Sequence, residues 1–132
     1  LGSGDGRAVR EAARLGAKAV GFEQSRLLVW WSKVWSWWGV ARHFMCRHAG
    51  DKPPRYKPTF ARTNYLKEDL SEADVIFCYL MPKAMEHLKE KFENELRSGT
   101  RIFSRAFKIP GWTPKARLQF SRRAPPVYVY MR

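Results

Sequence analysis

The chain has 132 residues, of which 45% are hydrophobic and 14% aromatic. This length is enough for one compact domain and too short for two, and the hydrophobic fraction argues against a disordered chain. Lysine and arginine number 25 against 12 acidic residues, so the formal net charge is +13. The most apolar stretch, residues 27–41, contains Lys33 and is shorter than the roughly 20 residues of a transmembrane helix.

The charge is distributed in blocks along the chain. Residues 24–67 contain nine basic side chains and one acidic one, whereas residues 68–95 contain three basic and eight acidic ones. Residues 96–132 contain nine basic side chains and no acidic one. Such a distribution favours an acidic partner: a nucleic acid, an anionic lipid or an acidic protein surface. The alternative is that the charge serves only to keep the protein soluble.

The first half of the chain predicts a helix, a strand and a second helix. Arg7–Leu15 has helical composition and is followed by Gly16, a typical helix end. Ala17–Glu23 predicts a short buried strand. Apolar residues recur at helical spacing through Ser25–His48 and predict a long helix, and the three prolines of Asp51–Pro58 predict a loop.

The second half of the chain predicts one helix, Lys83–Leu96, among several strands. The continuously apolar run Asp74–Leu80 predicts a strand that is buried on both faces. Lys108–Pro114 contains two prolines and a glycine and predicts a loop. The other expected strands are Thr59–Tyr65, Thr100–Phe107 and a terminal hairpin of Leu118–Phe120 with Val127–Met131. This order predicts an α/β fold whose sheet is mostly parallel, with an antiparallel C-terminal hairpin.

Three glycines alternate at the start of the chain, in the stretch Gly2-Ser3-Gly4-Asp5-Gly6. Glycine at such a turn lets the backbone bend tightly and approach a ligand. The dinucleotide fingerprint G-x-G-x-x-G requires a glycine where this chain has Arg7, which counts against a nicotinamide dinucleotide. Glu23 ends an apolar strand, where a carboxylate can accept hydrogen bonds from both ribose hydroxyls. Turn, helix and acid-ended strand together predict a nucleoside cofactor.

The stretch LGSGDGR at residues 1–7, followed by AKAVGFE at residues 17–23, resembles motif I and the next strand of class I S-adenosylmethionine-dependent methyltransferases. More narrowly, the chain resembles the small protein-lysine methyltransferase family that includes the enzymes for the ATP synthase c subunit and the adenine nucleotide translocase. The stretches that carry this narrower resemblance are Leu27–Trp38, Asn64–Leu66, Val75–Tyr79 with Pro82, and Ile109–Pro114.

The resemblance implies a single Rossmann-like domain over residues 1–132 that binds S-adenosylmethionine. Its first strand would lie upstream of Leu1, so the chain is expected to be N-terminally truncated and marginally stable alone. Glu23 would hold the ribose hydroxyls, and Asn64 would contact the adenine amino group. The cofactor-binding residues implied in this way are Gly2, Ser3, Gly4, Asp5, Gly6, Glu23, Asn64, Tyr65 and Leu66.

The resemblance also implies an acceptor site after the strand that contains Val75, with Tyr79 and Pro82 as the catalytic residues and Leu80 beside them. A lysine acceptor must be neutral to attack the methyl group, although the ordinary pKa of lysine is about 10.4. The Tyr79 hydroxyl can orient that amine. Alternatively, Tyr79 is an aromatic residue of the hydrophobic core. Asp69 can approach the same site, but its position in a polar stretch favours a loop cap.

The remaining chemical residues favour structural roles. The histidines have no partners at ligand spacing and are expected on helix surfaces, so no metal site is expected. The cysteines lack C-x-x-C spacing and are expected as small buried side chains. These residues are His43, His48, His87, Cys46 and Cys78. Five tryptophans within residues 30–38 cannot all face one core, so some are expected to contact a partner, an upstream segment or a membrane surface.

Protein-lysine methylation is therefore the leading function. A nucleic-acid methyltransferase is favoured by the charge, but the Asn/Asp-Pro-Pro-aromatic motif of base-amino enzymes is absent where the chain reads Cys78-Tyr79-Leu80-Met81-Pro82. A small-molecule methyltransferase and a non-catalytic basic binding module are also compatible with the sequence. The protein is expected to be a monomer that is cytoplasmic or bound peripherally at a membrane. Its acceptor is expected to be a protein, and a membrane-associated protein is one possibility.

Overall fold

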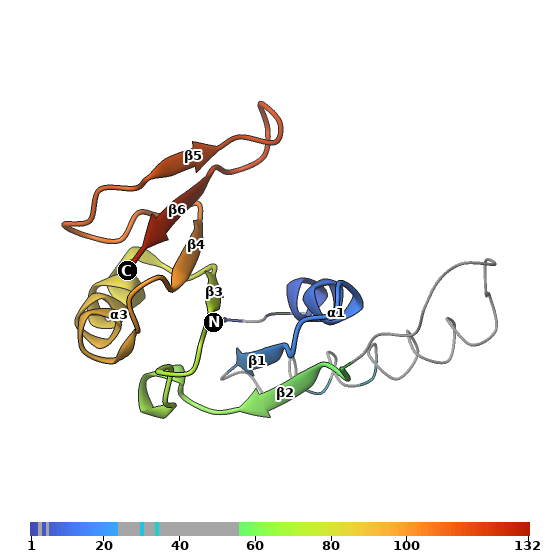
Figure 1. Cartoon of the computed structure of the whole chain (residues 1–132). Coiled ribbons are helices and arrows are strands. Elements are labelled where there is room, and N and C mark those ends of the chain that lie inside the picture. The colour runs from blue at the N-terminus through green and yellow to red at the C-terminus, as the bar shows by residue number, and fades with distance from the viewer. Residues whose placement is uncertain (3, 5, 24–29, 31–33, 35–55) are drawn as a thin grey trace. The chain divides into compact units, whose positions relative to one another are not determined.

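The computed structural model describes residues 1–2, 4, 6–23, 30, 34 and 56–132 (Figure 1). These residues form two compact units, which we describe separately: the glycine-turn unit, Gly2–Asn64, and the hairpin unit, Tyr65–Arg132 with Leu1. A single domain over residues 1–132 stays a prediction. Most of the helix predicted over Ser25–His48 lies outside the described residues, although Trp30 and Val34 are helical.

The glycine-turn unit contains one helix and two parallel strands. Helix α1, Arg7–Arg14, ends as predicted, because Gly16 has a φ of 91° and the Ala17 N–H donates to the Ala12 carbonyl at 3.0 Å. Strand β1, Val20–Glu23, pairs in parallel with β2, Thr59–Arg62, over their whole length. Both strands are confirmed but shorter than predicted, and the expected burial of β1 is wrong, since Val20 is exposed and only Gly21 is buried.

The hairpin unit contains a four-stranded sheet and one long helix. The strand order is β3-β4-β6-β5, in which β3 and β4 are parallel and the other two pairs are antiparallel. The predicted antiparallel C-terminal hairpin is therefore confirmed. The elements are the 3₁₀ helix Tyr65–Lys67, β3 Val75–Cys78, α3 Pro82–Glu95, β4 Arg101–Arg105, β5 Ala116–Leu118 and β6 Val127–Met131.

The core of the hairpin unit lies between α3 and one face of this sheet (Figure 1). The helix contributes side chains at the helical spacing of three and four residues, which places them on one stripe. Its sheet partners alternate along each strand, as expected for one buried face. The buried residues of this core include Met85, Leu88 and Phe92 of α3 and Ile76, Cys78, Ile102 and Tyr130 of the sheet.

The prediction that β3 is buried on both faces is wrong. Ile76 and Cys78 are 5% and 0% exposed, whereas Val75 and Phe77 are 48% and 39% exposed. Within the hairpin unit, α3 covers the Ile76 face, and the opposite face stays open to solvent. Burial raises the pKa of the Cys78 thiol, which confirms Cys78 as a small buried side chain without reactive character.

The predicted loop between β4 and β5 is confirmed and is fixed to the core. The Ile109 N–H donates to the Tyr130 hydroxyl at 3.1 Å, and Ile109 is 1% exposed. The Trp112 indole N–H donates to the Glu93 carboxylate at 2.9 Å, and its ring meets Tyr130 edge-on at 6.0 Å. The stretch Ile109–Pro114 therefore secures the fold. No helix among the described residues is long and apolar enough to cross a membrane.

Candidate functional site

The glycine turn and the acidic end of β1 are in direct contact. The Gly4 backbone N–H donates to Oε2 of Glu23 at 2.9 Å. This contact forms because α1 follows the turn directly, while β1 returns the chain and ends at Glu23. The carboxylate therefore lies at the carboxyl end of a parallel strand, beside the start of a helix. Ligands of α/β proteins bind at this place.

Gly6 is required by two separate constraints. Its φ of 78° is a left-handed conformation that side chains disfavour, and a Cβ there would lie 2.6 Å from Cε1 of Phe60. Gly4 also has a positive φ, 51°, but a Cβ there would meet no atom of the described residues within 4 Å. The turn is thus closed toward the core at Gly6 and open at Gly4, so a ligand can approach its backbone closely.

The adenine-side residues Asn64, Tyr65 and Leu66 lie in different surroundings. The register of β1 with β2 continues to a hydrogen bond from the Thr63 N–H to the Glu23 carbonyl at 3.3 Å, and half-buried Asn64 follows directly. Tyr65 is 8% exposed and belongs to the core of the hairpin unit, whereas Leu66 is 37% exposed. Their cofactor roles stay predictions, and Ser3 and Asp5 lie outside the described residues.

The expected acceptor residues follow β3 directly. Tyr79 is 52% exposed, which excludes the alternative that it is a core aromatic. Its backbone N–H donates to the Leu1 carbonyl at 3.4 Å. Pro82 is the exposed first residue of α3, where a missing N–H costs no helical hydrogen bond. The catalytic roles of Tyr79 and Pro82 stay predictions.

Arg105 is a neighbour of Tyr79 that the sequence alone did not indicate. Its guanidinium carbon lies 5.2 Å from the centroid of the Tyr79 ring, which is the geometry of a cation–π contact. The parallel register pairs Cys78 with Ser104, so the next residue of each strand lies opposite the other. The signal that would have found Arg105 was alignment of the two predicted strands, Asp74–Leu80 and Thr100–Phe107, at their amino ends, which places Tyr79 opposite Arg105.

Two other candidates have the structural roles that were expected. Asp69 accepts a hydrogen bond from the Ser71 N–H at 2.8 Å, and hydrogen bonds from Ser71 lower the pKa of the Asp69 carboxyl. This confirms Asp69 as a loop cap. His87 is exposed on α3, as predicted. No group of three His, Cys, Asp or Glu residues that could hold a metal ion occurs among the described residues. His43, His48 and Cys46 lie outside them.

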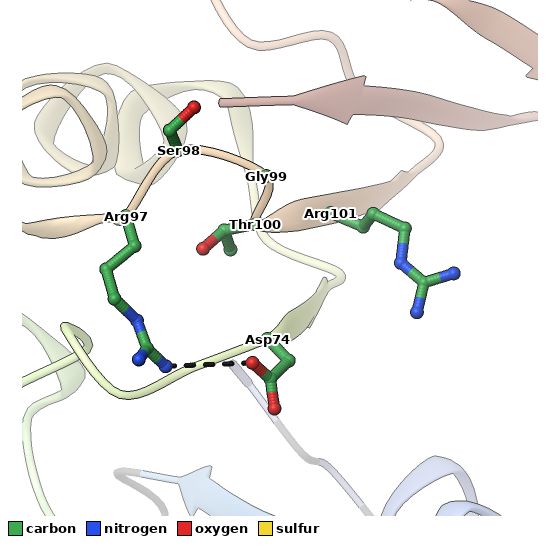
Figure 2. A pocket seen from close by; sticks show the side chains of 6 residues that line it. All are labelled: Asp74, Arg97, Ser98, Gly99, Thr100 and Arg101. Carbon is green, nitrogen blue, oxygen red and sulfur yellow. Dashed lines mark ion pairs between the residues drawn. The ribbon is translucent and has the colours of Figure 1, made fainter.

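An open hollow of about 300 Å³ lies at the amino ends of β3 and β4 (Figure 2). Arg97 pairs with Asp74 across it at 3.6 Å, and the Arg101 N–H donates to the Asp74 carbonyl at 3.0 Å. Thr100 Oγ1 donates to the Ala73 carbonyl at 2.9 Å. These contacts join the strand ends to each other. Ligands of α/β proteins bind at the carboxyl ends of the strands, whereas this hollow lies at the amino ends.

Comparison with known proteins places this arrangement in a family. Residues 1–116 match the ANTKMT methyltransferase domain. The chain is 36% identical over 118 residues to the Rattus norvegicus lysine N-methyltransferase of the ATP synthase c subunit, covering 86% of this chain and 47% of that protein. It is 30% identical over 117 residues to the adenine nucleotide translocase lysine N-methyltransferase of Mus musculus, covering 88% and 45%. The chain thus spans about half the length of these curated relatives.

A solved structure gives the same fold. The chain superimposes with a TM-score of 0.79 and 31% identity on an RNA methyltransferase from Salinibacter ruber in complex with S-adenosyl-L-homocysteine, covering 99% of this chain and 76% of that one. The expected α/β class I methyltransferase fold is therefore confirmed. The narrower resemblance is confirmed as well, and the chain belongs to the ANTKMT methyltransferase domain family.

Proposed function

We propose that the protein transfers methyl groups from S-adenosylmethionine to a lysine side chain of a protein. The observation that carries this proposal is the Gly4–Glu23 hydrogen bond, which joins the glycine turn to an acid-ended strand. Membership of a family whose relatives are named protein-lysine N-methyltransferases supports the lysine acceptor.

The residues of the glycine-turn unit fit the cofactor. The open space beside Gly4 accommodates the methionine part of a ligand. Glu23 accepts hydrogen bonds from ribose hydroxyls, because the two oxygens of a carboxylate offer several lone pairs. Bound S-adenosylmethionine supplies an electrophilic methyl carbon on a sulfonium sulfur. The chain aligns this methyl carbon with the acceptor amine, because alignment is the main requirement of a displacement reaction.

Tyr79 orients the acceptor. Its exposed hydroxyl accepts a hydrogen bond from the lysine amine, and its ring packs against the lysine side chain. The lone pair of the neutral amine forms the new N–C bond while the C–S bond breaks and its electron pair remains on sulfur. The methylated ammonium then releases one proton to water. No metal ligand is needed for this sequence of events.

A second candidate, RNA methylation, is favoured by two observations. The Salinibacter ruber structure is that of an RNA methyltransferase, and the chain carries a net charge of +13. The test uses the protein with tritiated S-adenosylmethionine and a cell lysate that is then split between protease and nuclease treatment. Label that is removed by protease and found on methyl-lysine supports the proposal, and label removed by nuclease supports RNA methylation.

The acceptor protein is proposed to lie at a membrane surface, with the enzyme binding there peripherally. The nine basic residues between positions 24 and 67 and the cluster of tryptophans support this, because both features favour an anionic bilayer interface. The methylating activity should sediment with membranes at low salt and be released at high salt, since salt screens surface charges. Activity that stays in the supernatant at low salt would contradict this part of the proposal.

A further inference from the structure

Arg105 and Tyr79 form an exposed pair at the carboxyl ends of β4 and β3. Both strands run in the same direction, and the pairing of Cys78 with Ser104 places the two following side chains next to each other. The Arg105 guanidinium carbon lies 5.2 Å from the Tyr79 ring centroid. The positive charge therefore lies beside the residue that the proposed function gives to the acceptor lysine.

The backbone around Arg105 is held on both sides. Ser104 is fully buried, and its Oγ donates to the Phe107 carbonyl at 2.6 Å. The Ala106 N–H donates to the Pro126 carbonyl at 2.8 Å, and Ala106 has a φ of 70°, which costs energy for any residue except glycine. These contacts fix the direction in which Arg105 leaves the sheet, so its position over Tyr79 does not depend on the cation–π contact alone.

The segment that contains Arg105 is strongly cationic. Lys108 lies 5.6 Å from the Tyr128 ring on β6. Residues 96–132 contain no acid. The other cations of β4, β5 and the loop before β6 are Arg101, Arg117, Arg122 and Arg123.

Carboxylates near the sheet are engaged elsewhere. Asp74, at the amino end of β3, pairs with Arg97. On α3, which covers the opposite face, Glu93 accepts from Trp112 and Glu95 from Leu70. The other acids of α3, Glu86 and Glu90, are exposed. No carboxylate among the described residues forms an ion pair with Arg105.

We propose that Arg105 favours the neutral, nucleophilic form of the lysine amine that binds against Tyr79. This inference rests on the proposed function. A lysine ammonium beside an unneutralised guanidinium is destabilised by like-charge repulsion, so it loses its proton at a lower pH than in water. The Arg105 guanidinium stays charged throughout, because arginine does not deprotonate in this pH range. Arg105 therefore acts through its charge and does not exchange a proton itself.

The test measures kcat of lysine methylation at saturating acceptor against pH for the wild type and three variants, because kcat reports the ionisation of the bound amine. Arg105→Gln should move the acidic limb of the profile up by about 0.5–1 pH unit, as expected for a unit charge several ångströms from the amine in a partly exposed site. Activity at a pH on that limb should fall about three- to tenfold, while the plateau at high pH is unchanged. Arg105→Lys, which keeps the charge, should restore the wild-type limb. Arg101→Gln is the matched control, since Arg101 is also exposed, on the same face and at the other end of β4, and it should leave the profile unchanged.

Each other outcome overturns the inference. An Arg105→Gln profile that is lowered equally at every pH indicates a merely structural role, and an unchanged profile shows that the charge has no effect. Calorimetry with S-adenosylhomocysteine and thermal melting confirm that each variant is folded and binds the cofactor product. A wild type that binds S-adenosylhomocysteine but methylates no protein lysine would overturn the proposed function and this inference with it, which distinguishes that case from failure of the Arg105 variants alone.

Discussion

The two units present opposite chemistry at the carboxyl ends of their parallel strands. In the glycine-turn unit, β1 ends in the Glu23 carboxylate beside an open backbone turn at Gly4. In the hairpin unit, β3 and β4 end in an aromatic ring, Tyr79, with the Arg105 guanidinium over it. In the proposed function, one end accepts hydrogen bonds from the hydroxyl groups of the cofactor, and the other repels the ammonium form of the acceptor.

Under the proposed function, this difference corresponds to different tasks for the two units. Holding a nucleoside needs acceptors and close backbone approach, which glycine and a carboxylate provide. Activating an amine needs a place where an ammonium is unfavourable, which a fixed cation provides. The two needs conflict within one cluster of side chains, because a carboxylate beside the acceptor amine would stabilise its protonated form. Separate strand ends resolve this conflict.

Gly6→Ala should have the greatest effect on the glycine-turn unit. The left-handed backbone and the close approach to the Phe60 ring together should lower the free energy of unfolding by about 2–4 kcal/mol. Gly16→Ala is the control, since its φ is 91° but a Cβ there meets no atom within 4 Å. Chemical denaturation of both variants measures the difference. Equal losses would show that the contact with Phe60 does not constrain the turn.

Glu23→Gln should weaken S-adenosylhomocysteine binding by about 1–3 kcal/mol, because the amide loses the charge-assisted hydrogen bonds to the ribose. Stability should change little, since the amide oxygen can still accept the Gly4 N–H. Calorimetry gives the affinity, with Glu11→Gln as the control, because Glu11 pairs with Arg14 on the exposed side of α1. Unchanged affinity would remove Glu23 from the cofactor site and with it the contrast between the two units.

Ala106→Gly should have the smallest effect and the opposite sign. Relief of the left-handed backbone exceeds the added chain entropy of glycine, so the free energy of unfolding should rise by about 0.5–1 kcal/mol. Ala84→Gly, in the helical backbone of α3, should instead lower it by about 1 kcal/mol. If the Ala106 variant is also destabilised, the turn that fixes Arg105 is not strained.

Local sequence signals predicted the helices and strands of the fold, but not which faces of each element are buried by others. Glycine as a helix end predicted the close of α1 at Gly16, and the run Val127–Met131 predicted the final strand, because both depend on neighbours in the chain. The burial of β3 depends on what packs over it. An apolar run such as Val75–Cys78 is compatible with one or two covered faces, so its open face was not predictable from composition.

The same distinction applies to the candidate site. The contact of the glycine turn with the end of β1 follows from motif spacing, because the helix between them has a fixed length. Arg105 was missed because its importance comes from the register of two strands separated by α3. An arginine in a strongly basic segment has no local feature that distinguishes it from its neighbours.

The strand order of the hairpin unit has a consequence for synthesis on the ribosome. β6 lies between β4 and β5, yet it follows both in the chain. Until residue 131 has emerged, β4 has an unpaired edge and β5 has no partner at all. The nascent chain therefore exposes strand edges and the apolar side chains of β4, a state that is prone to aggregation and is normally attended by chaperones. Completion of this sheet therefore waits for synthesis of its last strand, whatever the rate at which α3 forms.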